Sequence, residues 1–419
     1  MNWSESTHFA GLDWADDHHD LVILDRQGAI VDQWTFDHTV EGWTQCRQKL
    51  AAYGGHLAIA LETSRGLAID ELLRCALTLY PVQPLVASRL RDRKAPSGAK
   101  NDRLDAWALA EGLRLDGHLW KPLAPEDPIL LELRLLCRDE VTFIQQRTVL
   151  VNQLLAALKE YYPTAVEAFA DWTMASAWDF IIEFPTPQRL AQAGRRRWEK
   201  FLHTHKLWRP QTSQHRLDAF AKALEWQPAA AVVAAKSRQA TSLASMLHHL
   251  QIQLDHYRTR IEELFASHPD HHLFGSLPGA GPTLAPRLLG EVGGNRERFD
   301  SAQAMQCFAG TAPVSFQSGQ IHRVRIRRQC NRFFRHALHL YAQCSLLKSA
   351  WAEAYYQSLR ARGKSHACAL RCLAHRWLEI LWKMWQERRP YDAERHLANL
   401  KKHGSRTLAA ILTPAPAAQ

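Results

Sequence analysis

Short apolar runs dominate the first part of the chain. Three of them, HFAGLDWA, HDLVILD and GAIVDQWTF, are separated only by the polar turns ADDH and RQG. Runs this short, joined by turns this tight, predict three antiparallel strands. The pattern that follows predicts a helix at 40–53, a strand at 56–63 (HLAIALET), a helix at 67–79, a strand at 82–87 (VQPLVA) and a closing helix from Asp102.

A three-stranded meander followed by alternating helices and strands is the element order of a ribonuclease-H-like domain. We therefore predict an α/β domain of this type, RuvC-like, over residues 1–120. With 419 residues, the chain exceeds the usual size of one hydrophobic core, so further domains are expected.

Two later segments, 130–158 and 243–264, carry apolar or small residues at alternating steps of four and three. This heptad pattern predicts two long helices in a helical region over 121–268. The helices either pair with each other as an ordinary hairpin or form a coiled-coil stalk with a second chain, and the pattern leaves both open. Between them, the Trp-rich segment 161–238 is broken by prolines and predicts an inserted helical subdomain of unassigned role.

From residue 269 to 405 the pattern predicts a mostly helical C-terminal domain. The remaining residues, 406–419, include TPAPAAQ and are expected to be a disordered tail.

Composition and charge indicate a globular protein with a polyanionic partner. Hydrophobic residues make up 46% and charged residues 22%, enough to form packed cores. The formal net charge is +10, and its distribution is uneven. Residues 322–336 contain no acid and six arginines, a pattern typical of phosphate contact: Arg323, Arg325, Arg327, Arg328, Arg332 and Arg335.

Other whole-chain features favour a cytoplasmic protein without a membrane role. No apolar run reaches the roughly 18 residues that span a bilayer, and the N-terminus lacks the pattern of an export signal. The eight cysteines have no framework spacing, as expected of reduced thiols.

Four acids fall where a ribonuclease-H-like sheet would bring them together. Asp13 ends the first predicted strand, Glu62 ends the fourth, and Asp102 and Asp105 open the closing helix. Each taken singly is explained as a turn or capping residue. Together they predict a carboxylate cluster that needs cations between its members, and hard oxygen ligands suit Mg²⁺ or Mn²⁺.

The chain resembles the insertion-sequence transposases with a DEDD tetrad, a family that includes DNA invertases and bridge-RNA-guided recombinases. The matching blocks are GLDWA around Asp13, LETS around Glu62, KNDRLDA from Lys100, LPGAGPTLAPRLLGEVG, and RFDSAQAMQCFAGTAPVSFQSG. The resemblance implies a transposase or site-specific recombinase whose four acids, Asp13, Glu62, Asp102 and Asp105, hold the metal. It also implies DNA as substrate and a structured guide RNA as partner.

The resemblance assigns the nucleophile to Ser318, which would become covalently joined to DNA. Read without it, a Ser-Gly pair is most simply a turn, and Ser315 is the second candidate. The sequence departs from the family pattern just downstream, where Cys330 replaces an expected glycine and Arg328 an expected lysine. The change to cysteine removes easy access to positive φ and puts the placement of the arginines in question.

Two further motifs have weaker meanings. PGAGPTLA from Pro278 is similar to the hairpin of a helix-hairpin-helix, in which the amides of Gly279 and Gly281 would approach a DNA phosphate; a purely packing turn is the alternative. His366, Cys368, Cys372 and His375 lack the spacing of recognised zinc sites, and a buried helix face explains them better.

We therefore expect an enzyme that cleaves and rejoins DNA strands to move an insertion element, acting as a homodimer or homotetramer whose active sites combine acids and serine from different chains. The sequence leaves two alternatives open. One is a junction-resolving nuclease in which the metal activates water. The other is a non-catalytic nucleic-acid-binding protein with a decayed site, which the four intact acids disfavour.

Overall fold

The computed structural model describes residues 3–63, 66–75, 77–94, 101–124 and 126–404. The chain forms two compact units, Met1–Pro125 and Glu126–Gln419. The predicted disordered tail, 406–419, lies outside the described residues. The finer division of the second unit into a helical region and a C-terminal domain stays a prediction.

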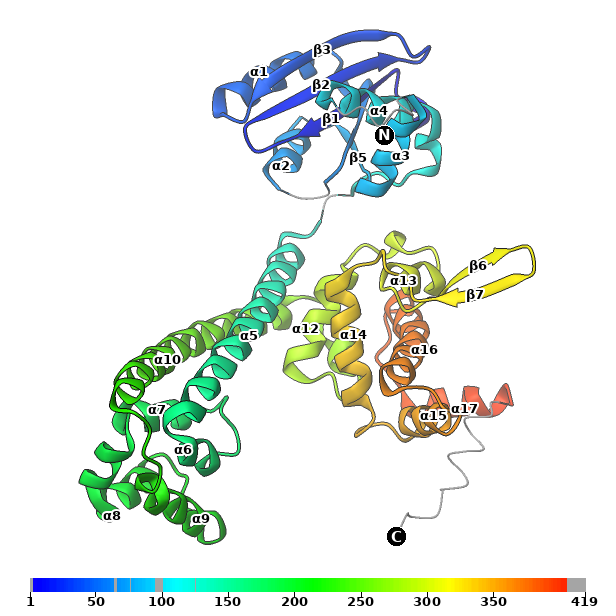
Figure 1. The fold of residues 1–419 in the computed structure, drawn as a ribbon. Helices are drawn as coiled ribbons and strands as arrows, with labels where there is room; N and C mark the ends of the chain where they lie inside the picture. The colour runs from blue at the N-terminus through cyan, green and yellow to red at the C-terminus, as the bar shows by residue number, and fades with distance from the viewer. Residues whose placement is uncertain (1–2, 64–65, 76, 95–100, 125, 405–419) are drawn as a thin grey trace. The chain divides into compact units, whose positions relative to one another are not determined.

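The first unit is built on a mixed five-stranded sheet (Figure 1). Its strand order is β3-β2-β1-β4-β5, with β1, β2 and β3 antiparallel and with β4 and β5 parallel to β1. The bounds are β1 His8–Trp14, β2 His18–Asp25, β3 Ile30–Asp37, β4 Leu57–Leu61 and β5 Thr78–Pro81. The predicted meander and the strand after it are confirmed, and the arrangement is consistent with a RuvC-like domain.

Helices cover both faces of this sheet. The apolar sides of α1 (Val40–Ala51) and α2 (Leu67–Leu73) pack on one face, and those of α3 (Pro84–Lys94) and α4 (Asp102–Asp116) pack on the other. α4 comes unusually close because β1 contributes Gly11 at the contact. A Cβ at Gly11 would lie 2.0 Å from the carbonyl oxygen of Ala106, so no larger residue fits without moving α4.

The strand predicted at 82–87 is wrong. The fifth strand lies earlier, at Thr78–Pro81, and most of VQPLVA belongs to the start of α3. Proline supports this arrangement, because Pro84 stands at the first position of a helix, where its fixed φ is favourable and its missing N–H is not needed. The helix predicted at 67–79 is correspondingly shorter and ends at Leu73.

The two heptad segments form α5 (Pro128–Tyr161) and α10 (Ala230–Ser267), which pack against each other within the chain. Three side-chain contacts join the two helices: Arg260 to Glu132, Arg258 to Glu140, and Arg147 to Gln251. Later residues of α10 contact earlier residues of α5, so the two helices are antiparallel. The antiparallel hairpin is therefore present in one chain. Pairing with a second chain stays a prediction.

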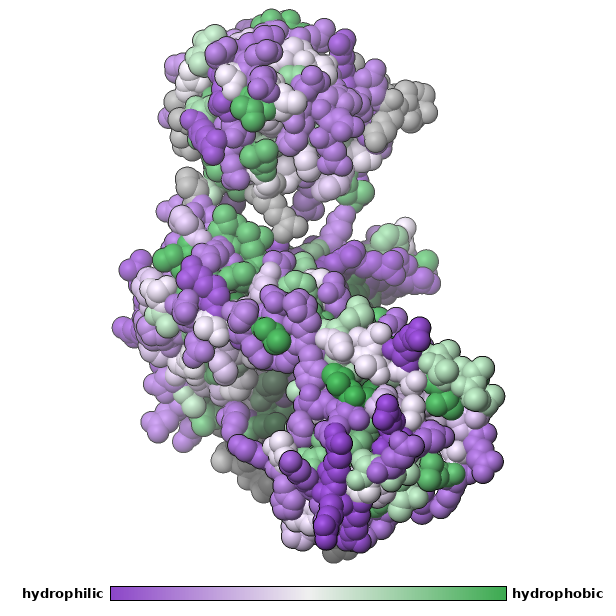
Figure 2. Space-filling model, turned by 90° about the vertical axis from the view of Figure 1, so that its left-hand side faces the viewer, coloured by the Kyte–Doolittle hydropathy of each residue, from purple (hydrophilic) through white to green (hydrophobic). Residues whose placement is uncertain are grey.

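The predicted insertion is helical and packs on one end of this hairpin. It comprises α6 (Pro163–Ala168), α7 (Ala175–Glu183), α8 (Pro187–Thr204) and α9 (Pro210–Ala221). Aromatic side chains fill its core, which continues onto Leu154 of α5 and Leu247 of α10. Figure 2, which views the side on which α8 and α9 lie in Figure 1, shows dark purple, hydrophilic side chains gathered low on that face.

The opposite end of the hairpin packs into a second helical core. Its elements are α11 (His271–Gly275), α12 (Gly281–Val292), α13 (Ala302–Phe308), α14 (Arg332–Ser345), α15 (Ala350–Ala361), α16 (His366–Glu387) and α17 (Ala393–Lys402). A buried ionic network joins α5 to this core, where Glu140 accepts from Arg287 at 2.7 Å and Glu291 accepts from Arg138 at 2.7 Å. One element was not predicted: β6 (Val314–Ser318) and β7 (Ile321–Arg325) form a hairpin that extends from the helices (Figure 1).

Candidate active site

Three of the four predicted acids converge at one edge of the sheet. Asp13 is the last residue but one of β1, and Asp102 and Asp105 stand in the first turn of α4, where Asn101 caps the helix by accepting from the N–H of Arg103. Carboxylate oxygens of these three acids all lie within 4.8 Å of one another. Such a set of hard oxygen donors fits one divalent cation.

Glu62 completes the quartet from the neighbouring strand. Leu12 of β1 is paired with Leu61 of β4, so the residues that follow them, Asp13 and Glu62, stand side by side at the same edge. The three-acid group that could share one ion does not include Glu62 among the described residues. The charge of Glu62 nevertheless acts on Asp13 and helps to raise its pKa.

The electrostatics of the cluster centre on Asp13. Burial, reinforced by repulsion from Asp105, Asp102, Glu62 and Asp20, raises the pKa of Asp13 to about 7. A cation placed among these acids would stabilise the ionised form of Asp13, because it would offset the repulsion between the carboxylates.

Arg91 also reaches the cluster, and sequence reasoning missed it. Its Nη1 atom donates to both oxygens of Asp105, at 2.8 and 3.1 Å. This hydrogen bond with Asp105 raises the pKa of Arg91 above its ordinary value. Because 82–87 was predicted as a strand, the helix that carries Arg91 to the acids was not expected.

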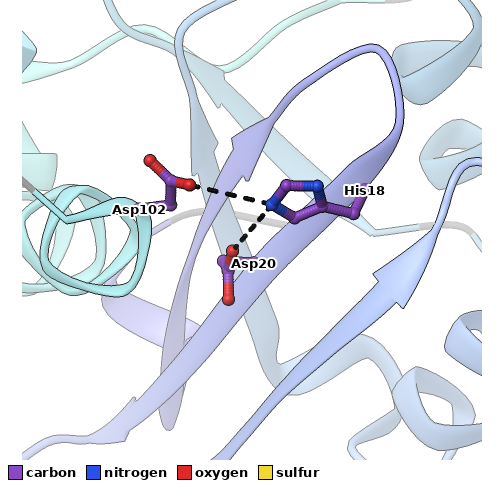
Figure 3. A group of neighbouring side chains, drawn as sticks. All are labelled: His18, Asp20 and Asp102. Atoms are coloured by element: carbon purple, nitrogen blue, oxygen red, sulfur yellow. Dashed lines mark ion pairs between the residues drawn. The ribbon is translucent and has the colours of Figure 1, made fainter.

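Asp20 and His18 of β2 were missed as well. Asp20 is paired directly with Asp13 across the sheet and is only 6% exposed. It accepts from the hydroxyl of Thr35 at 2.6 Å. Figure 3 shows Nε2 of His18 facing both Asp20 and Asp102, at 3.9 and 3.7 Å from their carboxylate oxygens. β2 is buried over six consecutive residues, on both faces, so no alternation of burial could have singled out Asp20.

The candidate nucleophile lies on the hairpin of β6 and β7. Ser318 is the last residue of β6 and is paired with Ile321, and the intervening turn begins with Gly319 at a φ of 54°. In the paired register, Phe316 lies opposite Arg323 on the same face as Ser318, whereas Ser315 lies opposite Val324 on the other face. Every residue of the two strands is exposed.

The predicted arginines surround this hairpin and its base. Arg323, Arg325, Arg328 and Arg332 are exposed, and Arg327 and Arg335 are half-buried. The guanidinium of Arg325 lies 5.5 Å from the ring centre of Phe316. Ser318, Arg323 and Arg325 therefore occupy one exposed hairpin, and the other four arginines lie at its base or at the start of α14.

The departure at Cys330 is accommodated without strain. Its φ is not positive, so a glycine is not required there, and Asn331 directly after it caps α14 by accepting from the N–H of Phe334. The glycine in this region is Gly310, which has a φ of 71° and leaves room for the Cys330 side chain. The sulfur contacts the guanidinium of Arg335.

Gly279 and Gly281 lie at the turn between α11 and α12. A Cβ at Gly279 would lie 2.6 Å from the carbonyl oxygen of Cys344, so packing against α14 already requires glycine there. Around Gly281 the corresponding space is open. Phosphate contact by either amide stays a prediction.

In α16, the rings of His366 and His375 contact the hydroxyls of Tyr356 and Thr311.

Known proteins match both parts of this arrangement. The sequence model of a family described as "Transposase" matches residues 10–163, and that of the "Transposase IS116/IS110/IS902 family" matches residues 271–357. The mini-circle putative transposase for IS117 of Streptomyces coelicolor is 32% identical over 408 residues, which cover 95% of this chain and 99% of that protein. The chain belongs to the IS110 family of DEDD transposases.

Other relatives of this transposase extend over nearly the same length. The insertion element IS900 uncharacterized 42 kDa protein of Mycobacterium paratuberculosis is 29% identical, covering 91% of this chain and 96% of that protein. The insertion element IS116 uncharacterized 44.8 kDa protein of Streptomyces clavuligerus is 28% identical, covering 88% and 96%.

As a member of this family, the transposase is an enzyme that cleaves and rejoins DNA, and the family's acidic tetrad implies dependence on a divalent metal. Within the described residues, no helix of the transposase is both long and apolar enough to cross a membrane.

Proposed function

We propose that this transposase moves its element through a covalent link between Ser318 and DNA, with the reacting phosphate held at Asp13, Glu62, Asp102 and Asp105. The observation that carries the proposal is the approach of three carboxylates to within 4.8 Å of one another. Acids placed so close together repel one another, and together with burial this repulsion raises the pKa of Asp13 to about 7. A cation bound among them would relieve the repulsion.

The donor set fits Mg²⁺ or Mn²⁺. Asp13, Asp102 and Asp105 would hold one ion, and Glu62 beside Asp13 would extend the site toward a second. When bound, such ions stabilise the charge on the attacking and leaving oxygens of a phosphodiester. Arg91 is positioned to balance the charge of Asp105, and Asp20 adds a further negative group behind Asp13.

Ser318 supplies the attacking oxygen. Its Oγ forms a bond to phosphorus as the bond from phosphorus to one deoxyribose oxygen breaks, the Oγ proton is lost, and the leaving strand takes up a proton. In rejoining, a deoxyribose hydroxyl of the new partner strand displaces Oγ. The exposed hairpin supports this role, because Arg323 and Arg325 share the face of Ser318 and can bind phosphate oxygens.

We further infer from the resemblance that a structured RNA pairs with the donor and target DNA, and that the enzyme acts as a homodimer or homotetramer. The arginines at 323–335 can bind either nucleic acid through phosphates. Because only part of α5 and α10 is buried within the chain, exposed side chains on both helices are available to contact another chain.

A suicide DNA substrate tests the covalent step. The wild type should yield a protein–DNA adduct that survives denaturation, and peptide mapping should place it at Ser318. Ser318→Ala should form no adduct, whereas Ser315→Ala, on the opposite face of the hairpin, is the matched control and should retain it. Cleavage by a folded Ser318→Ala protein without any adduct would instead support a nuclease that activates water.

A further inference from the structure

A strongly basic surface covers α8 of the inserted subdomain, which lies between the two ranges matched by the family models. Residues 188–209 contain one acid, Glu199, and seven cationic residues. All seven are exposed: Arg189, Arg195, Arg196, Arg197, Lys200, Lys206 and Arg209. The proposed chemistry at the acids and Ser318 uses none of them.

The three consecutive arginines stand where helix electrostatics disfavours them. Gly194, with φ 74° and ψ 168°, interrupts α8, so Arg195, Arg196 and Arg197 form the first turn of the helical segment that follows. The start of a helix carries partial positive charge, and cations there are unfavourable. The arginines therefore do not serve the stability of this helix through its dipole.

Local ion pairs satisfy only part of this charge. Arg195 contacts Glu199 and Arg197 contacts Glu183, each at 2.9 Å. Arg196 and Lys200 stand four residues apart on one helical face, where like charges repel each other. Among the described residues, neither Arg196 nor Lys200 forms an ion pair with an acidic side chain. An unbalanced, outward-facing cluster of this kind is complementary to a polyanion.

The aromatic residues of the segment favour contact with a phosphate backbone over unpaired bases. Trp208 is stacked on the ring of His203, with centroids 4.6 Å apart and planes inclined by 17°. Trp198 is half-buried, and its Nε1 donates to the carbonyl of Leu190 at 2.6 Å. Trp198 is therefore not free to stack on a base, and His203 already occupies one face of the Trp208 ring; stacking of bases on free aromatic rings is the usual means of binding single strands.

We propose that α8 of the inserted subdomain is a second DNA-binding surface, which contacts the phosphate backbone of duplex DNA without regard to sequence and independently of the arginine hairpin. The proposal rests on the enzyme's action on DNA but not on the identity of its nucleophile. Such a surface would hold DNA flanking the cleaved position and add to the salt-dependent part of the affinity.

The test compares two full-length triple variants in binding duplex DNA of arbitrary sequence over a series of salt concentrations. One is Arg195→Gln, Arg196→Gln and Lys200→Gln. Its matched control, Lys348→Gln, Arg362→Gln and Lys364→Gln, removes the same charge from exposed positions in the turns between the C-terminal helices. The α8 variant should lower the slope of log affinity against log salt by about two to three units, at about 0.9 for each lost contact. The control should change it by less than one unit.

An unchanged slope in a folded α8 variant would overturn the proposal. An equal loss in the control would also overturn it, because the effect would then reflect net charge alone. Loss of binding to a structured RNA, with duplex DNA binding intact, would assign the surface to RNA instead. Repeating the measurement in an Asp13→Asn background should give the same slopes, so that failure of the cleavage proposal is distinguished from failure of this one.

Discussion

Asp13 on β1 is paired directly with Asp20 on β2, so two carboxylates face each other across neighbouring strands at the edge where α4 begins. Like charges opposite each other destabilise a sheet. This pair of acids therefore lowers the stability of the sheet edge but favours the binding of a cation there.

Replacing one of these acids should separate catalysis from stability. Asp13→Asn should reduce cleavage to background. Because the pKa of Asp13 is raised from its unfolded value to about 7, the native state holds its proton more tightly, and stability falls as pH rises from about 4 through 7. In chelator, the variant should therefore melt above the wild type at pH 8 and equally near pH 4.

The control for this comparison is Asp16→Asn, which removes an exposed acid from the turn after β1. It should leave cleavage unchanged. If Asp13→Asn cleaves as fast as the wild type, Asp13 has no part in the metal site.

The arginine hairpin should control affinity through phosphate contacts. Replacing Arg325 and Arg327 together by glutamine should lower the slope of log affinity against log salt by about one to two units. Lys401 and Lys402, exposed at the end of α17, provide the charge-matched control. An equal slope for wild type and hairpin variant would mean that these arginines face protein.

A buried histidine should make the first unit sensitive to acid. Burial, with repulsion from His38 and His18, lowers the pKa of His19 to about 4, while in the unfolded chain it is about 6.5. The unfolded state therefore binds the extra proton first, and stability should fall as pH drops from about 6.5 to about 4.

His19→Gln should flatten this dependence in melting experiments on the full chain, because the substituted residue has no proton to bind. His322→Gln, at an exposed position of the hairpin, is the control and should keep the wild-type slope. Parallel curves for wild type and His19→Gln would contradict the assignment.

The expected sharing of active sites between chains can be tested by complementation. Asp13→Asn and Ser318→Ala proteins should each be inactive alone. Mixed oligomers should regain part of the cleavage, because some sites then combine intact acids from one chain with an intact serine from the other. If mixed oligomers form and cleavage stays absent, each site is built within one chain.

Several features followed from the sequence because their causes are local. Short apolar runs and tight polar turns predicted β1 to β3, and the heptad spacing predicted α5 and α10. The approach of Asp13, Asp102 and Asp105 was also predictable, since strand ends and helix starts in this topology share one edge. The family's motifs supported the same residues independently.

Other features depended on contacts that no local pattern encodes. The heptad spacing suits a hairpin and a stalk equally, and only the Arg260–Glu132 and Arg258–Glu140 contacts show that the two helices pair within the chain. The hairpin carrying Ser318 escaped prediction because all its side chains are exposed, so burial imposes no alternation on them. Asp20 and Arg91 joined the acidic site through cross-strand register and helix packing. Tertiary structure decided these points because register and packing depend on residues far apart in the chain, whereas periodicity reports only on neighbours.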